Sequence, residues 1–415
     1  MNLLLPLKTL RNRLSHAAIL LFLVPCTLAA TNFQNLYSFT GGNAGQGPLA
    51  GLVADGSGNL FGTTVGGGTH ACGTIFELSH TNGAWSEKVL YSFTCGNDGR
   101  YPSASLIFDE AGNLYGTTAG LYTVSNGNVF ELVHQKNDRW TLKVLYSFSG
   151  KGDGTNPVAG LVLDQGGNLY GTAPRGAEGF GAVFELQPNG HGSWKEKVLH
   201  RFANGRDGAF PMAALTFDSA GNIYGTAEYG GGVPPCGGCG AVFQLTPQQN
   251  GNWKYQVIHR FRGTDGSFPF ASMIVDAQGN LYGTTHSGGP KGGGTVFELM
   301  KNQNGHWGRR SLHNFGLNPL TGLGPQTALF FDTSGNLWGT TLEGGNLGCN
   351  YGCGVVFELT PDGQGQWNES VAHTFVGNPG YYPAGTLISD TTGHLYGTTE
   401  GDGKLTFGSV YEITP

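Results

Sequence analysis

The stretch GNLYGTT, at residues 279–285, decides the fold because near-copies of it recur along the chain. There are seven copies, and their central glycines lie 54 to 58 residues apart. A fixed period of this length is typical of solenoids and propellers, in which each repeat is one supersecondary unit. The central glycines are Gly62, Gly116, Gly171, Gly225, Gly283, Gly339 and Gly397.

Each repeat contains four short stretches that are rich in β-formers and are bounded by Gly, Pro, Asn or Asp. In the third repeat they cover residues 159–164, 168–173, 182–187 and 194–202. No helical pattern lies between them, so each repeat predicts four successive strands. The chain is therefore predicted to be all-β, a seven-bladed β-propeller with four antiparallel strands per blade. The predicted blades are residues 50–93, 104–148, 159–202, 213–261, 271–315, 327–375, and 384–415 together with 31–39.

The two ends of the repeat region are predicted to close the ring. A Trp precedes the last Phe of the fourth strand by eight residues in six repeats. The seventh copy of this strand is N-terminal, where eight residues before Phe39 is Thr31, while the C-terminal VYEITP lacks a fourth strand. Residues 31–39 should therefore pair with residues 410–414, because an open ring would expose sheet edges.

The first hairpin of each repeat carries a turn signal. An Asp ends the first strand and a Gly follows three residues later, so the carboxylate can accept backbone N–H groups while the Gly takes positive φ. An Asn follows this Gly in six repeats, and His394 takes its place in the seventh. The Gly inside LYGTT is expected to admit a neighbouring backbone. The turn acids are Asp55, Asp109, Asp164, Asp218, Asp276, Asp332 and Asp390.

A second hairpin predicts cross-strand pairs. The Glu of VFEL lies 11 or 12 residues before a basic residue of the Trp-led strand, and in the fourth repeat both positions change together to Gln. Such joint change is expected of directly opposed residues at a surface, so this acidic position is assigned a structural role. The pairs are Glu77 with Lys88, Glu131 with Lys143, Glu185 with Lys197, Gln244 with Gln256, Glu298 with Arg310, and Glu358 with Ser370.

Residues 1–30 have the pattern of a secretory signal peptide, with Lys8, Arg11 and Arg13 before an apolar run that ends in small residues. The mature chain is thus expected to be secreted, periplasmic or at the cell surface, with no membrane span after cleavage. An uncleaved anchor and lipid attachment at Cys26 are alternatives that Pro25 disfavours. The net charge of -6 gives no reason to expect a nucleic-acid partner. No cofactor is expected.

The unit SF.GGNDG..P.A.L.FD..GNLYGTT..GG....GTVFELT resembles the tandem repeat of the choice-of-anchor GloVer-containing proteins, over residues 31–415. This resemblance implies an exported bacterial repeat protein for which the family provides no assigned activity. The family has varied C-terminal anchors, whereas this sequence ends at Pro415 without an apolar tail. The D..GN.Y hairpin is also similar to that of NHL-type propellers.

The six cysteines that follow residue 30 predict three disulfides, because an even number in an exported chain favours pairing. A zinc site built from CGGC and CNYGC is the alternative, but it requires blades four and six to meet. Four histidines cannot form a metal site, because they occupy one outer-strand position in four separate blades. The disulfides are predicted between Cys72 and Cys95, Cys236 and Cys239, and Cys349 and Cys353, and the histidines are His200, His259, His313 and His373.

The loops that lead into the first strand of each blade, here called lead-in loops, should share a face with the loops after LYGTT. This face is the expected binding face. A Pro precedes every first strand, and the residue before it is aromatic in four repeats. Close to the axis these rings would offer stacking surfaces for a sugar or other flat ligand, and packing between blades is the alternative. They are Tyr101, Phe210, Phe268 and Tyr382.

Two further sets lie on the same face. The positions after LYGTT carry charged and aromatic residues that would suit acid–base chemistry or, for Arg175 and Tyr229, ligand contact, with solvated loop charges as the alternative. The lead-in loops also carry four Asp-Gly pairs, for which turn formation is the primary interpretation and calcium binding a second one. The first set is Arg175, Glu228, Tyr229, His286, Glu343 and Glu400, and the second is Asp98, Asp153, Asp207 and Asp265.

Three functional hypotheses follow from the sequence. The first is a non-catalytic exported propeller that binds a glycan, a peptide or a cell-surface component. The second is a propeller hydrolase or lyase acting on an extracellular polysaccharide through Glu228, His286, Glu343, Glu400 and Arg175. The third is a purely structural surface module.

Overall fold

The computed structural model describes residues 31–120, 125–176, 179–232, 236–316, 320–346, 348–378, 380–401 and 407–415. The predicted signal peptide and Cys26 lie outside the described residues. None of the described residues forms a helix that is long and apolar enough to cross a membrane.

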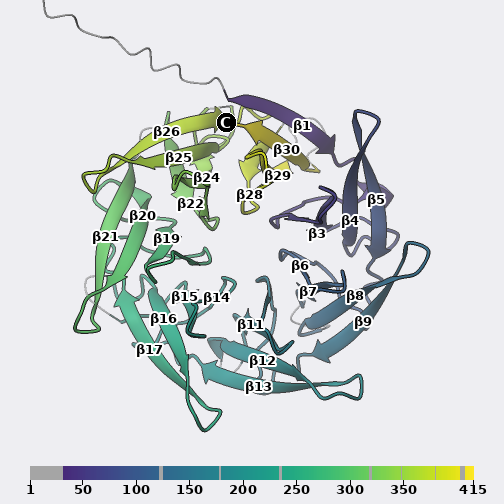
Figure 1. Cartoon of the computed structure of the whole chain (residues 1–415), viewed down its shortest axis with the longest axis horizontal. Coiled ribbons are helices and arrows are strands. Elements are labelled where there is room, and N and C mark those ends of the chain that lie inside the picture. Colours follow the sequence, from purple (N-terminus) through teal and green to yellow (C-terminus); the bar gives the residue numbers. More distant parts are fainter. Residues whose placement is uncertain are drawn as a thin grey trace, which may run out of the picture. The chain divides into compact units, whose positions relative to one another are not determined.

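The described residues of 31–415 form seven antiparallel sheets that are arranged in a ring around a central axis (Figure 1). Strands pair in sequence order in five of the sheets, and β1 joins the end of the last one, which confirms the predicted seven-bladed propeller. Blades 6 and 7 each contain one additional short strand at the inner end.

The strands of blades 1 to 4 are as follows: blade 1, β2 (Val53–Ala54), β3 (Leu60–Thr64), β4 (Thr74–Thr81) and β5 (Ala84–Ser92); blade 2, β6 (Ile107–Phe108), β7 (Leu114–Thr118), β8 (Asn128–Gln135) and β9 (Arg139–Ser147); blade 3, β10 (Val162–Leu163), β11 (Leu169–Ala173), β12 (Ala182–Pro188) and β13 (Trp194–Arg201); blade 4, β14 (Thr216–Phe217), β15 (Ile223–Ala227), β16 (Ala241–Pro247) and β17 (Trp253–Arg260).

The remaining elements are as follows: blade 5, β18 (Ile274–Val275), β19 (Leu281–Thr285), β20 (Gly292–Lys301) and β21 (Trp307–Gly316); blade 6, β22 (Gly322–Pro325), β23 (Phe330–Phe331), β24 (Leu337–Gly344), β25 (Val355–Pro361) and β26 (Trp367–Thr374); blade 7, β27 (Tyr381–Pro383), β28 (Ile388–Ser389), β29 (Leu395–Gly401), β30 (Ser409–Thr414) and β1 (Asn32–Ser38); and one short 3-10 helix, η1 (Gly42–Ala44).

Ring closure occurs as predicted, because β1 supplies the outer strand of the last blade and lies beside β30 (Figure 1). Asn32 lies opposite Thr414, and Ser38 lies opposite Ser409. Backbone hydrogen bonds therefore join the first and last described strands, so the outer edge of β30 is paired with β1.

The turn acids hold the first hairpin as expected. In blade 3, Oδ1 of Asp164 accepts the backbone N–H groups of Gly166 and Asn168, both at 2.8 Å. Its Oδ2 accepts the Asn168 amide at 2.8 Å and the Tyr170 hydroxyl at 3.0 Å. Gly167 has φ of 80°, in the left-handed region that favours glycine. The Asn and Tyr of the repeated motif thus fix the turn from two sides.

The predicted cross-strand pairs are all present, including Gln244 opposite Gln256 and Glu358 opposite Ser370. Their expected position at a surface is wrong for three blades, since Glu185, Gln244 and Glu298 are only 4%, 7% and 3% exposed. In blades 3 and 5 the carboxylate has a third partner, because the tyrosine of the second strand donates its hydroxyl to Glu185 and to Glu298, at 3.1 and 2.9 Å. The structural role of the position stands.

The glycine inside LYGTT faces a side chain, which corrects the expectation that a neighbouring backbone approaches it. A Cβ at Gly171 would lie 2.6 Å from the Phe184 ring and 2.9 Å from Leu161. The same contact recurs around the ring, with Phe297 joined by Met273 in blade 5 and with Tyr411 in blade 7. The motif needs glycine because the aromatic ring of the third strand occupies the space of a β-carbon.

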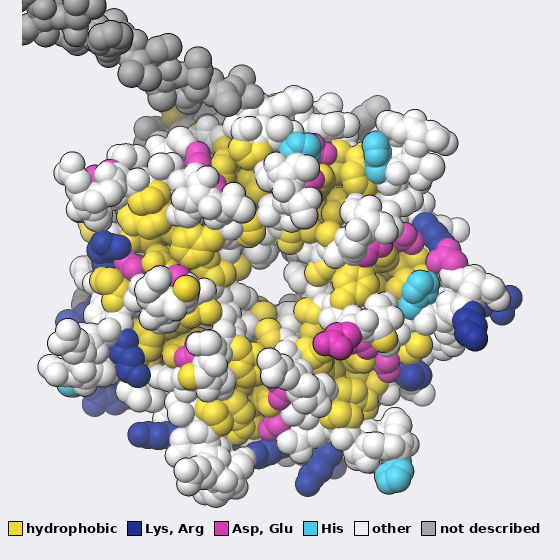
Figure 2. Space-filling model, viewed as in Figure 1, with side chains coloured by type: hydrophobic (Ala, Val, Ile, Leu, Met, Phe, Trp, Pro, Cys, Tyr) yellow, Lys and Arg dark blue, Asp and Glu magenta, His cyan; other side chains and the backbone are white. Residues whose placement is uncertain are grey.

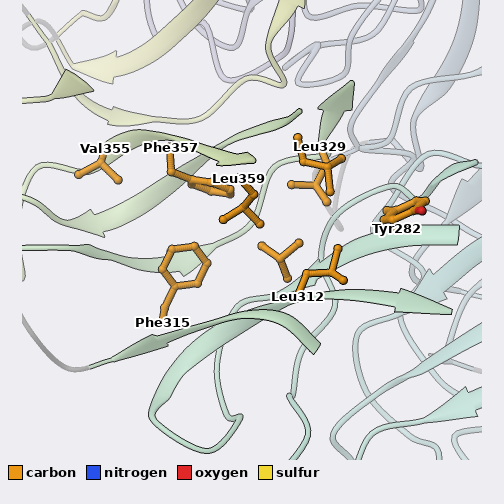
Figure 3. Packing of buried hydrophobic residues seen from close by; sticks show 9 residues of the cluster. Tyr282, Leu312, Phe315, Leu329, Val355, Phe357 and Leu359 are labelled. Atoms are coloured by element: carbon orange, nitrogen blue, oxygen red, sulfur yellow. The ribbon is translucent and has the colours of Figure 1, made fainter. Parts of the chain in front are cut away.

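Each blade packs on the next through a buried aromatic pair. In the junction shown in Figure 3, Phe315 at the end of β21 meets Phe357 of β25 edge-on, with ring centroids 5.2 Å apart. Equivalent pairs occur at all seven junctions, with centroid distances from 5.0 to 5.5 Å. The core is therefore a circle of similar clusters, in which each blade completes the core of its neighbour.

Candidate functional site

The central channel has walls of small side chains. It encloses about 240 Å³ and is lined by three-residue segments that follow the repeated Pro, such as residues 103–105 and 158–160. None of the described residues that line it is acidic, basic or a histidine. Hydrophobic side chains surround the central hole on the face seen in Figure 2, while Lys and Arg lie toward the outer edge. The channel wall therefore offers no acid–base group.

The two predicted sets of loops do share one face, here called the loop face. Backbone bridges join the lead-in loop of a blade to the loop after its second strand, as between Thr155 and Arg175 and between Ala209 and Tyr229. The Pro that follows the lead-in loop packs on the preceding blade: a Cβ at Gly181 would lie 2.7 Å from Pro211. The residue just before each Pro is thereby held at a junction between blades.

All seven residues before the repeated Pro have left-handed backbone conformations. The aromatic four have φ between 54° and 58°, and Asn156, Gly47 and Gly324 have φ between 61° and 67°. Gly and Asn adopt this region at low cost, whereas a bulky residue there is strained. Hydrogen bonds hold Phe210 in place, because its N–H donates to Phe180 O at 2.9 Å and its carbonyl accepts the Glu228 N–H at 3.1 Å.

Four aromatic side chains gather at the junctions of blades 3, 4 and 5, and we call them the aromatic ridge: Phe180, Phe210, Tyr229 and Phe268. Tyr229 lies between the two predicted rings, with centroids 5.8 Å from Phe210 and 5.1 Å from Phe268. Phe180 lies 6.1 Å from Phe210 on the other side. Tyr229 is 41% exposed, so the ridge is open to solvent.

Two charged residues of the sequence prediction adjoin this ridge. The Arg175 guanidinium lies over the Phe210 ring, 5.5 Å from its centroid. Glu228 is buried, and burial raises the pKa of its carboxyl, an effect that Tyr229 and Arg175 offset in part. The Glu228 carboxylate in turn raises the pKa of the Tyr229 hydroxyl. Phe210, Phe268, Arg175, Glu228 and Tyr229 thus form one group.

The other predicted residues lie at different junctions. Tyr101 and Tyr382 have the same backbone setting in blades 2 and 7, where each donates its N–H to the carbonyl of a cysteine in the preceding blade at 2.9 Å. Burial raises the pKa of Tyr382, and Glu343 and Glu400 add to this effect. His286 packs against Gly324 of blade 6, and burial lowers its pKa.

The aromatic residues therefore lie outside the channel wall, and their expected position beside the axis needs correction. The wall is formed by residues that follow the Pro, whereas the aromatic residue precedes it and is tied to the adjoining blade. The predicted acid–base set is likewise divided. Glu228 adjoins Arg175 between blades 3 and 4, while Glu343 and Glu400 flank Tyr382 between blades 6 and 7.

The Asp-Gly pairs act as turn residues. Asp153 accepts the Ser149 N–H at 2.7 Å and the Tyr146 hydroxyl at 2.8 Å. In the next two loops His200 and His259 replace the tyrosine, at 3.3 and 3.1 Å from the Asp oxygen. Among the described residues, no group of three or more His, Cys, Asp or Glu side chains is placed to hold a metal ion.

Three disulfides lie in loops of the same face, as predicted. They join Cys72 to Cys95, Cys236 to Cys239, and Cys349 to Cys353, with Cα–Cα distances of 5.5, 5.7 and 5.1 Å. The first crosses from blade 1 into the lead-in loop of blade 2, so it ties two blades together.

Sequence reasoning missed two features of this face. Phe180 precedes the Gly that opens its third strand, a position at which the repeat shows no preference for an aromatic residue. A cavity of about 520 Å³ near the ridge is lined by Arg206, Arg260 and Arg262, which belong to two successive repeats.

Comparison with known proteins identifies a family and several similar folds. The model of the Gloeobacter/Verrucomicrobia repeat matches residues 22–235 and 235–415. No curated protein matches this chain.

Solved structures with a similar fold include three proteins of low sequence identity. A gluconolactonase from Xanthomonas campestris is 17% identical, with 76% of this chain and 86% of that chain covered and a TM-score of 0.42. A luciferin-regenerating enzyme is 15% identical, with 76% and 91% covered and a TM-score of 0.44. A putative oxidoreductase described as a glucose dehydrogenase, from Thermus thermophilus, is 13% identical, with 92% and 100% covered and a TM-score of 0.44.

These likenesses assign no activity, because the identities lie below 20% and the TM-scores below 0.5. The family match covers both halves of the chain. This protein belongs to the Gloeobacter/Verrucomicrobia repeat family.

Proposed function

We propose that this propeller is a non-catalytic, exported binding module that recognises a carbohydrate through the aromatic ridge. The observation that carries the proposal is Tyr229, which is 41% exposed between Phe210 and Phe268 on the loop face. Aromatic faces suit the apolar C–H surface of a sugar ring, and Arg175 and Glu228 supply polar groups beside them.

Backbone strain supports a binding role for the ridge. Phe210 and Phe268 occupy a left-handed position that Gly occupies in blades 1 and 6. Each bulky residue in such a conformation costs on the order of 1–3 kcal/mol. Packing between blades does not require an aromatic residue at this position, because blades 1 and 6 pack on their neighbours with Gly there. A ligand-binding role is therefore the better explanation for keeping a strained aromatic residue.

Export is part of the same proposal. The three disulfides suit an oxidising compartment, and the signal-peptide pattern of residues 1–30 supplies the route.

The hydrolase or lyase alternative is less well supported. A glycosidase places two carboxyl groups on either side of one scissile bond, about 5–9.5 Å apart. Here Glu228 is grouped with an arginine and a tyrosine, and no carboxylate is found among the described residues that line the central channel, to which all seven blades contribute.

Carbohydrate binding is tested with a glycan array followed by calorimetric titration of the best oligosaccharide. Covering about 100 Å² of apolar surface at one sugar–ring contact contributes about 2.5 kcal/mol, so Tyr229→Ala and Phe268→Ala should each weaken binding at least about tenfold. Tyr351→Ala is the matched control, because Tyr351 is 79% exposed but lies in blade 6, away from the ridge. Unchanged affinity in the ridge variants, or an array without any binding, would refute the proposal.

A further inference from the structure

Three arginines converge on one cavity at the outer side of the loop face. The cavity holds about 520 Å³ and is lined by Arg206, Arg260 and Arg262, together with His259 and Asp265. Arg206 comes from the lead-in loop of blade 4, Arg260 ends β17, and Arg262 begins the lead-in loop of blade 5. Two chain segments more than 50 residues apart therefore supply the same kind of charge to one place.

A hydrogen bond joins the two segments that line the cavity. Arg260 donates its Nε–H to the backbone carbonyl of Arg206 at 2.9 Å. Among the described residues, none of the three arginines forms an ion pair with a carboxylate. Arg206 and Arg262 are exposed.

The one acidic residue of the lining, Asp265, is already compensated. Its carboxylate accepts the Arg262 N–H at 2.7 Å and lies 3.1 Å from Nε2 of His259. Burial opposes its ionisation, but these hydrogen bonds and the nearby Arg309 hold its pKa below the usual value. The lining thus retains a surplus of positive charge on a chain whose net charge is -6.

The same two lead-in loops carry two of the four residues of the aromatic ridge, Phe210 and Phe268. Arg206 lies four residues before Phe210, and Arg262 lies six residues before Phe268. Blade 3 adds Lys151 in its lead-in loop and Arg201 at the end of its outer strand, and blade 2 adds Arg100, whereas the lead-in sequences of blades 1, 6 and 7 contain no Lys or Arg. Stacking groups and uncompensated arginines are therefore combined in one sector of the ring.

We propose that Arg206, Arg260 and Arg262 form an oxyanion subsite, so that the ligand is an anionic polysaccharide whose sugar ring stacks on the aromatic ridge. This inference rests on the proposed carbohydrate-binding function and adds the charge of the ligand. Guanidinium groups bind carboxylate and sulfate in a bidentate manner, and both groups occur on extracellular polysaccharides.

The test compares two charge-matched double variants by calorimetry. Arg206→Gln/Arg262→Gln removes two cations of the cavity, and Lys195→Gln/Lys254→Gln removes two exposed cations of the neighbouring outer strands. Hexagalacturonate should bind the arginine variant at least about tenfold more weakly than wild type, and the lysine variant within about twofold. An equal loss in both variants would overturn the subsite, because it would reflect net charge alone.

Ligand controls separate charge from sugar. The fully methyl-esterified hexamer keeps the rings without the charges and should bind wild type about tenfold more weakly than hexagalacturonate. A sulfated κ-carrageenan hexasaccharide tests the other oxyanion, and dependence of either acidic glycan on the arginine pair supports the subsite. A single-stranded DNA hexamer that binds as tightly as the better glycan would contradict a polysaccharide ligand.

The outcomes distinguish this inference from the proposed function. If the methyl ester binds as well as the acid and Tyr229→Ala abolishes both, the ridge binds sugar and the oxyanion subsite is refuted. If none of the glycans binds, the proposed function itself fails.

Discussion

Replacing Phe210 by two different small residues tests whether its left-handed backbone stores strain. Phe210→Ala keeps a β-carbon at φ of 54°, whereas Phe210→Gly removes it, and both variants lose the same half-buried ring. A non-glycine residue in this region costs about 1–2 kcal/mol, and glycine loses about 0.5–1 kcal/mol of chain entropy on folding. The glycine variant should therefore be more stable than the alanine variant by about 0.5–1 kcal/mol.

The total loss of stability in Phe210→Ala also depends on how much of the Phe210 ring is buried. Complete burial of Phe makes Phe→Ala cost about 3–5 kcal/mol, so a half-buried ring predicts about 2 kcal/mol for Phe210→Ala. Urea unfolding, monitored by tryptophan fluorescence with the disulfides intact, measures both values. An alanine variant as stable as the glycine variant would show that the backbone is unstrained, and the strain argument for ligand binding would fail. Gly47→Ala, at φ of 67°, is the reciprocal variant and should destabilise the chain by at least about 1 kcal/mol, because the added β-carbon would also lie 2.9 Å from the Val65 side chain.

Two further predictions concern stability. A disulfide stabilises more when it closes a longer loop, and the loops here span 23 and 3 residues. The free energy of unfolding in urea should therefore fall by about 3.4 kcal/mol in Cys72→Ser/Cys95→Ser and by about 1.6 kcal/mol in Cys236→Ser/Cys239→Ser. Equal losses in the two variants would contradict this explanation. Burial raises the pKa of Glu196 to about 7, with Asp153 adding to it, so the folded chain binds this proton more tightly than the unfolded chain. The protonated Glu196 carboxyl therefore supports the folded state fully below pH 4.5, and this stability is lost as the pH rises toward 7. Glu196→Gln should therefore gain stability relative to wild type between about pH 5 and pH 8, and a difference that is independent of pH would refute the assignment.

The sequence was sufficient to predict the fold because its signals are local and repeat seven times. The turn acids, the opposed Glu and Lys positions and the shared spacing of Phe39 with the Trp-led strands each predict a pairing that the structure contains. The three disulfides could be predicted from the superposition of the seven repeats, because it places each pair of cysteines in one loop or in adjoining loops of one face.

The environment of the repeated glycine was not predictable in this way. A period shows that a β-carbon is excluded at Gly171, but it does not show whether a backbone or the Phe184 ring fills the space. Which group fills the space depends on the distance between the second and third strands and on the direction of the Phe184 side chain, and a repeat period contains neither.

The site depends on relations between blades, which the repeat does not encode. Phe210, Phe268 and Tyr229 were predicted separately, from their positions before Pro or after LYGTT. Their contact arises because the loop of one blade leans on the lead-in loop of the next. The cavity of Arg206 and Arg262 was missed for the same reason, since its cations occupy different positions within their repeats.

The most direct test of the central claim is hydrogen–deuterium exchange of the full chain with and without the best-binding oligosaccharide of the array. Ligand binding at the aromatic ridge should slow exchange in residues 205–210, 228–232 and 262–268, and should leave the Asp-turn hairpins at 164–168 and 218–222 unchanged. Protection confined to those hairpins, which lie at the opposite ends of the first two strands of each blade, would contradict the placement of the binding site on the loop face.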